Sequence, residues 1–261
     1  MKQFETIEFR IQDSVACITL NRPAFANSMN GQLVSELSDA AVICDNDKSV
    51  RVVLLTGNGP IFCAGGDLKA FAGAQSNLSP QLKLLADNLH KAISLFARMT
   101  PIVVVAVNGM AAGAGFSLAI SGDYVLAAES AKFSMAYTGA GLTPDGSSTY
   151  YLPRLVGLRR TQELIITNRA LTADEALDWG LVTRVVPDDQ LQAEALAFAR
   201  QLARGPHEAL GMVKKLLLAS PANGLEVQME LEGRAIAHAS MSADGIEGVG
   251  AFVEKRKPCF Q

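Results

Sequence analysis

The sequence contains few of the residues that mark metal sites, disulfide-bonded scaffolds or nucleic-acid-binding surfaces. Only four of its 261 residues are cysteines, and no two of them have the Cys-x-x-Cys spacing of a zinc or redox site. We therefore expect free thiols in a reducing compartment. Charged residues make up only 19% and the net charge is −3, so no strongly basic surface for nucleic acid is indicated.

Long apolar runs are absent as well. The longest, near residues 101–107, is far shorter than the roughly 20 residues that span a bilayer. The first five residues, Met-Lys-Gln-Phe-Glu, are too polar and acidic for a signal peptide. We therefore expect a cytoplasmic protein with no membrane partner. With 49% hydrophobic residues, the chain is rich enough in apolar side chains to form a substantial core.

Strand and helix patterns alternate along most of the chain. Short apolar runs predict strands at residues 7–10, 15–20, 50–56, 101–107, 124–128, 131–135 and 182–186. Helical periodicity is clearest at residues 32–44 and 82–99, whereas the small, polar stretch 73–79 is typical of a loop. After Pro187 only helical patterns follow. The pattern predicts an α/β core over residues 1–188 and a helical C-terminal appendage over residues 189–261, and such an appendage often serves as an oligomerisation region.

Two glycine-bearing turns, residues 62–68 and 110–116, each follow a predicted strand and precede a predicted helix. Such a turn can present a backbone N–H group near the positive end of a helix dipole. Two such donors that converge on one oxygen would stabilise an enolate or a tetrahedral oxyanion. Either turn taken alone is more simply explained as a tight strand-to-helix connection. Gly113 and Gly115 lack the third glycine of a dinucleotide-binding GxGxxG motif.

Asp145 is the carboxylate best placed to act as a base near these turns. It lies in Thr-Pro-Asp-Gly, residues 143–146, which is also ordinary turn chemistry. Apolar residues flank this turn on both sides, at 140–142 and 150–152. Poor solvation would raise the pKa of the Asp145 carboxyl group and make it a useful acid/base.

Other candidate residues are weaker. Three histidines are scattered along the chain, and of these only His90 directly precedes the central stretch. A lone histidine on a helix is more often structural or exposed than catalytic. Tyr137 could belong to the core or line a pocket. The basic run that begins at Lys255 could be a solvated tail or a contact for phosphates.

Six segments together resemble the crotonase (enoyl-CoA hydratase/isomerase) superfamily, and the resemblance covers essentially the whole chain. They are residues 21–30, 62–68, 107–115, 130–133, 152–157 and 176–182. The resemblance implies a spiral of ββα repeats with a C-terminal helical trimerisation region. It also implies a homotrimer or a dimer of trimers, and no metal or redox cofactor.

The implied substrate is an acyl-CoA thioester, of which coenzyme A is a part. Its carbonyl oxygen is expected between two backbone N–H groups, which match Gly66 and Ala114 in this sequence. The remaining implied contacts to substrate or CoA are Ala64, Gly65, Asp67, Leu68, Tyr137 and, among the basic side chains, Lys255.

Departures from the family pattern bear on the reaction. Hydratases of this family carry two glutamates where this chain has Ser117 and Tyr137, neither of which exchanges a proton as a carboxylate does. A simple hydratase is therefore disfavoured. Asp145 matches a position that carries an aspartate in two branches. One resembles ring-1,2-epoxyphenylacetyl-CoA isomerase, and the other is 4-chlorobenzoyl-CoA dehalogenase.

The dehalogenase branch carries a tryptophan at the position of Tyr137 and a base histidine on the helix that holds His90. His90 falls about one residue out of register with that histidine, and one residue turns a helical side chain by roughly 100°. The isomerase is therefore favoured, with Asp145 moving a proton through a dienolate. A hydratase, a dehalogenase-like hydrolase and a non-catalytic acyl-CoA-binding protein stay open as alternatives.

Overall fold

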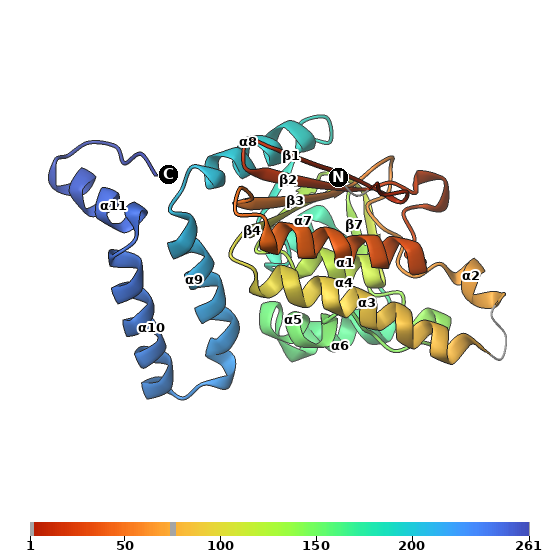
Figure 1. Cartoon of the computed structure of the whole chain (residues 1–261). Coiled ribbons are helices and arrows are strands. Elements are labelled where there is room, and N and C mark those ends of the chain that lie inside the picture. Colours follow the sequence, from red (N-terminus) through yellow and green to blue (C-terminus); the bar gives the residue numbers. More distant parts are fainter. Residues whose placement is uncertain (1–2, 74–76, 261) are drawn as a thin grey trace.

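The strands form two sheets in a computed structural model that describes residues 3–73 and 77–260 (Figure 1). The larger sheet contains, in spatial order, β1 (Ile7–Gln12), β2 (Val15–Leu20), β3 (Val52–Gly57), β4 (Ile102–Val107), β6 (Tyr124–Ala128) and β9 (Arg184–Val186). β1 and β2 form an antiparallel hairpin, and the other neighbours are parallel. The smaller sheet contains β5 (Met110–Ala112), β7 (Lys132–Ser134) and β8 (Leu171–Thr172).

The helices connect these strands and then continue alone to the C-terminus. Between the strands lie α1 (Gly31–Asn46), α2 (Leu68–Ala72), α3 (Leu78–Arg98), α4 (Ala114–Ile120), α5 (Ser148–Leu155), α6 (Gly157–Thr167) and α7 (Ala173–Asp178). After the last strand follow α8 (Leu191–Ala203), α9 (His207–Ala219), α10 (Leu225–Ser240) and α11 (Ala243–Val253). Short 3₁₀ turns lie at η1 (Pro23–Phe25), η3 (Thr138–Ala140) and η4 (Ser220–Ala222).

Repeats of strand, strand and helix wind into a spiral. In β4–β5–α4 and in β6–β7–α5, the first strand joins the larger sheet and the second joins the smaller one. β3 starts a similar repeat, because the chain after it pairs with β5 through a single bridge from Cys63 to Ala111 before it enters α2. The predicted α/β spiral is therefore confirmed.

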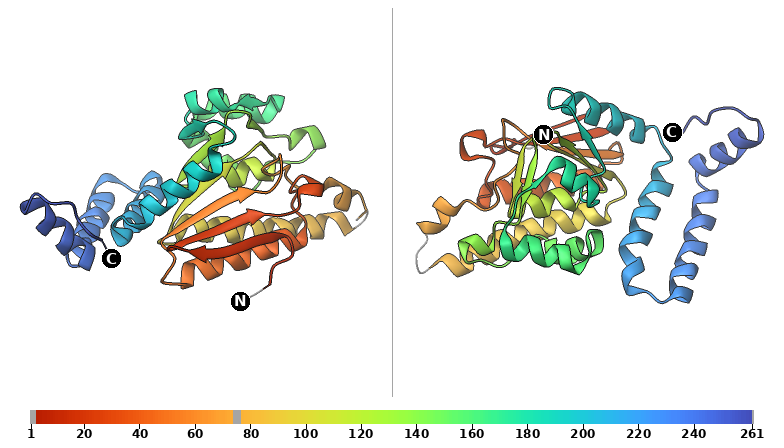
Figure 2. Two further views of the ribbon diagram at one scale, coloured as in Figure 1. Left: turned by 90° about the horizontal axis from the view of Figure 1, so that it is seen from above. Right: turned by 180° about the vertical axis from the view of Figure 1, so that it is seen from behind.

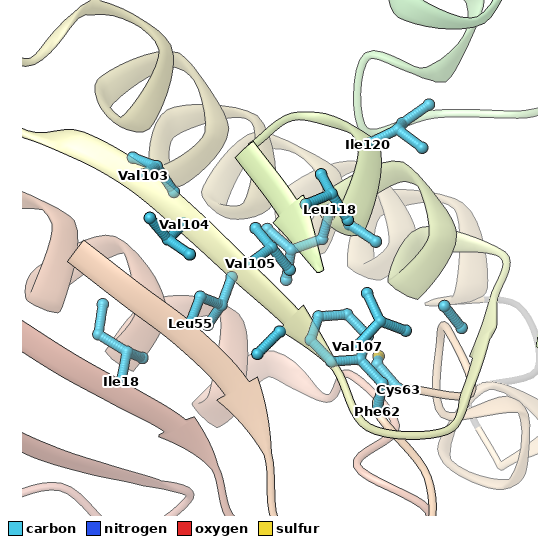
Figure 3. Close-up of a cluster of buried hydrophobic side chains, with 14 of the residues drawn as sticks. Ile18, Leu55, Phe62, Cys63, Val103, Val104, Val105, Val107, Leu118 and Ile120 are labelled. Atoms are coloured by element: carbon cyan, nitrogen blue, oxygen red, sulfur yellow. The ribbon is translucent and has the colours of Figure 1, made fainter. Parts of the chain in front are cut away.

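The core lies on both faces of the larger sheet. β3 and β4 are apolar and almost entirely buried, as expected of parallel strands that are covered on both faces. Figure 3 shows side chains of these strands beside Leu118 and Ile120 of α4, with Phe62 and Cys63 near the end of β4. α1 and α3 lie on one side of the sheet and α8 on the other (Figure 1). The core therefore fixes the two chain segments that follow β3 and β4.

Most sequence-based elements are confirmed, and three predictions need correction. The turn predicted at residues 110–116 contains β5, and its helix begins at Ala114 rather than at Phe116. Residues 74–76 of the loop predicted at 73–79 lie outside the described residues, and α3 already begins at Leu78. α8, which the sequence analysis grouped with the oligomerisation region, packs against β3, β4 and β6.

The helices α9 to α11 project from the body of the molecule (Figure 2). α9 is joined to the core by Lys214, whose ammonium group lies 2.6 Å from an Asp123 carboxylate oxygen and donates to the Pro101 carbonyl at 3.1 Å. α10 and α11 contain large apolar side chains that are exposed in the single chain. None of the helices in the described part of the chain has the length and apolarity that crossing a membrane requires.

Candidate active site

The backbone N–H group of Gly66 is free, because the residues on either side of Gly66 make the hydrogen bonds to the neighbouring segment. Met29 donates to the Gly65 carbonyl at 2.7 Å, and Asp67 donates to the Met29 carbonyl at 3.0 Å. Gly66 lies between Gly65 and Asp67 in this parallel bridge, so its own N–H group points away from Met29. Within residues 3–73 and 77–260 that N–H has no acceptor.

Ala114 presents the second donor, because it is the first residue of α4 and the first N–H groups of a helix have no intrahelical partner. Gly113, which precedes it, donates instead to the Ser134 carbonyl of the neighbouring strand β7 at 3.0 Å. The Ala114 N–H has no acceptor in the described part of the chain. Both donors are therefore backbone N–H groups that are left unpaired by the path of the chain and not by the identity of their side chains.

The two turns lie in close contact. The bridge between Cys63 and Ala111 pairs the chain segments that lead to them. A Cβ atom on Gly65 would lie 2.9 Å from the Ala112 carbonyl oxygen and 3.3 Å from the Ala114 nitrogen. Gly65 also has φ +91°, a conformation that L side chains rarely adopt. Glycine at position 65 is therefore what allows the second donor to approach the first.

A cavity of about 340 Å³ connects these donors with the candidate carboxylate. Its lining includes Gly66, Ala114 and Asp145, together with Ala64, Gly65, Leu68 and Tyr137. Its remaining wall is mostly aliphatic or aromatic, from residues that include Phe71, Leu82, Leu85, Ala86 and Leu142. The structure therefore brings most of the sequence-based candidates into one largely apolar cavity, as expected of a site for a small organic group.

Asp145 is held at one oxygen by a chain of hydroxyl groups. The Tyr137 hydroxyl donates to Asp145 Oδ1 at 2.6 Å. That bond uses the only tyrosine proton, so between Tyr137 and Ser117, whose oxygens lie 3.0 Å apart, Ser117 is the donor. The Ser117 proton also lies within reach of the Gly113 carbonyl oxygen, which is 3.3 Å from Ser117 Oγ. Burial, followed by the adjacent Asp145 carboxylate, raises the pKa of Tyr137 above its ordinary value. Tyr137 therefore remains a hydrogen-bond donor, and Asp145 Oδ2 is left for other partners.

The Asp145 side chain is only half-buried. It retains 29% exposure in the single chain, so its apolar flanks cover it only in part. Cys63, which lies at the start of the first turn, offers no nucleophile, because burial raises the pKa of its thiol to about 12. Among the described residues no cluster of histidine, cysteine, aspartate or glutamate could hold a metal ion.

His90 is the functional candidate that the sequence misplaced. Its Nε2 atom lies 3.9 Å from Asp145 Oδ2 and accepts a hydrogen bond from the Gly146 N–H at 3.1 Å. The predicted register difference of one residue therefore does not turn His90 away from Asp145. Phe71 and Leu85 of the cavity wall carried no motif, so no sequence signal identified them.

Two predicted CoA contacts lie outside the cavity lining. Asp67 is buried, caps α2 by accepting from the Ala70 N–H at 3.2 Å, and pairs with Arg22 at 3.1 Å. Asp67 therefore stabilises the start of α2. Lys255 follows α11, which lies at the opposite end of the molecule from α2 (Figures 1 and 2). A contact between Lys255 and bound CoA stays a prediction that would require a second copy of the chain.

Comparisons with known proteins agree with this arrangement. A family model described as enoyl-CoA hydratase/isomerase matches residues 10–261. An Escherichia coli 1,2-epoxyphenylacetyl-CoA isomerase is 38% identical and a Rhodobacter capsulatus "Probable enoyl-CoA hydratase" 40% identical, each over 98% of both chains. An Arthrobacter 4-chlorobenzoyl coenzyme A dehalogenase is 37% identical over 84% of this chain and 80% of its own. 

Solved structures give the same result for the fold. The crystal structure of an enoyl-CoA hydratase from Polaromonas sp. superposes with a TM-score of 0.93 at 31% identity, covering 98% of this chain and 99% of the other. The family model spans nearly the whole sequence, and the structural likeness includes both sheets and the C-terminal helices. The chain therefore belongs to the enoyl-CoA hydratase/isomerase (crotonase) family of acyl-CoA enzymes.

Proposed function

We propose that this chain is an enoyl-CoA isomerase in which Asp145 is the single acid/base. The observation that carries the proposal is the hydrogen bond of 2.6 Å from Tyr137 to Asp145 Oδ1 in a cavity that also contains the N–H groups of Gly66 and Ala114. The positions of both hydratase glutamates carry hydroxyl side chains, and these orient one carboxylate instead. The similarity to 1,2-epoxyphenylacetyl-CoA isomerase supports the same reading.

In this mechanism the thioester carbonyl oxygen accepts hydrogen bonds from Gly66 and Ala114. Asp145 Oδ2 removes a proton from carbon 2 of a 3-enoyl-CoA, and the electron pair of that C–H bond delocalises into a dienolate. The two N–H groups stabilise the negative charge on the oxygen, where preorganised donors are most effective. The Asp145 carboxyl group then returns the proton to carbon 4, and the product is the conjugated 2-enoyl-CoA. No water is consumed and no atom is lost.

A product screen by mass spectrometry tests this proposal. The chain is incubated separately with 3-enoyl-CoA and 2-enoyl-CoA in oxygen-18 water. We expect 3-enoyl-CoA to give a 2-enoyl product of unchanged mass and no label, which chromatography separates from the substrate of equal mass. A labelled product heavier by one water would instead support a hydratase, and would show that the hydroxyl groups of Ser117 and Tyr137 can replace the two glutamates.

Replacing Tyr137 by phenylalanine should lower kcat by roughly tenfold to a hundredfold, with little change in KM. A hydrogen bond to a charged group contributes about 1.5–3 kcal/mol, and here it orients the base rather than the bound substrate. The measurement is steady-state kinetics with 3-enoyl-CoA. Ser117→Ala is the matched control, because it removes the outer hydroxyl and leaves the contact between Tyr137 and Asp145. Equal losses in both variants, or none in Tyr137→Phe, would contradict the proposed orientation of Asp145.

A second candidate function is a dehalogenase-like hydrolysis, and the position of His90 beside Asp145 favours it. An Asp145 oxygen would attack a halogen-bearing ring carbon, halide would leave, and water would then hydrolyse the aryl ester. Release of chloride from 4-chlorobenzoyl-CoA, with formation of the hydroxy product, is the test. The Gly146 N–H occupies the Nε2 lone pair that would activate this water, so we favour isomerisation.

We also propose that the projecting helices associate with further copies of this chain in a trimer. Twelve large apolar side chains of α9 to α11 and the residue after α10 are exposed, a density typical of an interaction surface. They are Val213, Leu217, Leu225, Val227, Met229, Leu231, Ile236, Met241, Ile246, Val249, Phe252 and Val253.

A double substitution tests this surface. Ile236 is 72% exposed and Phe252 85% exposed, so Ile236→Glu with Phe252→Glu should not disturb the fold of one chain. In an assembly, however, both carboxylates would be buried without partners, which is strongly unfavourable. We expect light scattering to give three times the chain mass of 27.7 kDa for the native protein and a smaller mass for the variant. An unchanged mass in the variant would exclude these helices as the interface.

A further inference from the structure

His90 makes one well-defined contact, and that contact is with the loop that carries Asp145. The Gly146 N–H donates to His90 Nε2 at 3.1 Å, while the same nitrogen lies 3.9 Å from Asp145 Oδ2, beyond hydrogen-bonding distance. His90 comes from α3, whereas Gly146 precedes α5. The contact therefore joins two elements 56 residues apart in the sequence, directly at the candidate acid/base.

The direction of this hydrogen bond assigns the state of the imidazole. An N–H group donates to Nε2, so Nε2 carries a lone pair and the ring proton is on Nδ1. The only lone pair of the neutral ring is then already used. His90 in this state can neither take a proton from water at Nε2 nor donate one from Nε2 to Asp145.

The loop needs such a contact, because its backbone is unusual. Gly146 has φ +59° and Ser147 has φ +70°, so two consecutive residues are left-handed and the second is not glycine. A Cβ on Gly146 would lie 2.8 Å from the Ser117 Cβ, which shows how tightly the loop lies against α4. On the other side, Ser148 Oγ donates to the Asp145 carbonyl at 2.9 Å. The loop is thus held by α3, by α4 and by its own helix.

We infer that His90 is a positioning residue, and that its neutral imidazole holds the Gly146 N–H and thereby fixes Asp145 for proton transfer. Together, the contact from His90 and the contact from Tyr137 restrain Asp145 through its backbone and through Oδ1. Oδ2 is then the oxygen that faces the substrate. The inference rests on the proposed isomerisation, and it assigns His90 a role different from that of a general base.

Two substitutions separate positioning from base catalysis. In His90→Gln, the amide oxygen reaches about as far as Nε2 and can accept from Gly146, but it cannot act as a base. In His90→Ala the acceptor is lost. We expect kcat to fall roughly tenfold to a hundredfold in His90→Ala with little change in KM, as for a displaced catalytic group. We expect His90→Gln to recover most of that loss. A general base would instead leave both variants equally impaired, and that result would overturn the inference.

The tautomer provides an independent readout on the native chain. With ¹⁵N-histidine labelling, the imidazole resonance that disappears in His90→Gln belongs to His90, and His238→Gln, in an exposed position on α10, is the control. We expect a pyridine-type nitrogen at Nε2 and a pyrrole-type nitrogen at Nδ1. The opposite tautomer, or two protonated nitrogens, would overturn the inference. Absence of isomerase activity in the native chain would contradict the proposed function, whereas the tautomer tests the His90 contact separately.

Discussion

Replacement of Asp145 by asparagine should abolish nearly all turnover of 3-enoyl-CoA while the cavity keeps its shape. The amide has the same size as the carboxylate, and its oxygen can still accept from the Tyr137 hydroxyl at the position of Oδ1. It cannot, however, hold the proton between its removal from carbon 2 and its delivery to carbon 4. A positioned acid/base typically contributes about 10²–10⁴-fold, so we expect kcat to fall by about that factor. Steady-state kinetics of the double-bond shift measure it.

Binding distinguishes loss of the acid/base from loss of the site. Calorimetric titration with the 2-enoyl-CoA product should give native-like affinity in Asp145→Asn, because no residue that contacts the thioester oxygen changes. Near-native turnover in this variant would show that Asp145 is only a turn residue, and the non-catalytic reading of its Pro-Asp-Gly sequence would then gain support. If the native chain binds 2-enoyl-CoA but shows no turnover, the alternative of an acyl-CoA-binding protein would be supported.

Ala114→Pro should reduce kcat by about 10²–10³-fold, the range seen when one oxyanion donor is removed. Proline has no N–H group, and it is well tolerated at the first position of a helix, which Ala114 occupies in α4. The substitution therefore deletes the donor and places a ring carbon where the hydrogen was, without removing an intrahelical hydrogen bond. Kinetics with 3-enoyl-CoA and the thermal unfolding midpoint are measured together.

Ala114→Gly is the matched control, because it changes the side chain at the same position and keeps the N–H group. We expect native-like turnover in this control and a similar unfolding midpoint in both variants. If Ala114→Gly lost as much activity as Ala114→Pro, the methyl group rather than the N–H would be responsible. If neither variant lost activity, the thioester oxygen would not bind at Ala114.

The sequence predicts elements whose causes are local. The two strands predicted at residues 7–10 and 15–20 belong to one continuous stretch of chain, and they form the hairpin β1–β2. The free N–H of Ala114 is also local, because it follows from the start of α4, whereas that of Gly66 depends on the bridge to Met29. The proximity of Gly66 and Ala114 could be expected only through the family resemblance, since it depends on pairing between segments about 50 residues apart.

The position of His90 could not be derived in the same way. Its direction depends on how α3 lies against the loop before α5, and that packing is set by contacts far apart in the sequence. The comparison of sequence register used only the position of His90 along its helix. It left out the loop, where Gly146 and Ser147 adopt left-handed conformations and the Gly146 N–H group reaches the imidazole. The 29% exposure of the Asp145 side chain has a related cause, because apolar neighbours in the sequence need not cover a carboxylate completely in space.

The two N–H groups that we propose as oxyanion donors belong to the main chain, and this has a consequence for how such a site can change over evolutionary time. Almost any codon change at position 114 other than one to proline leaves an N–H group in place, so the proposed donor at this position tolerates mutation. The proposed acid/base Asp145 and the two hydroxyl groups that orient it, at 117 and 137, are instead side chains on separate segments, and each can be exchanged alone. Selection can therefore alter what happens to the enolate without rebuilding what stabilises it.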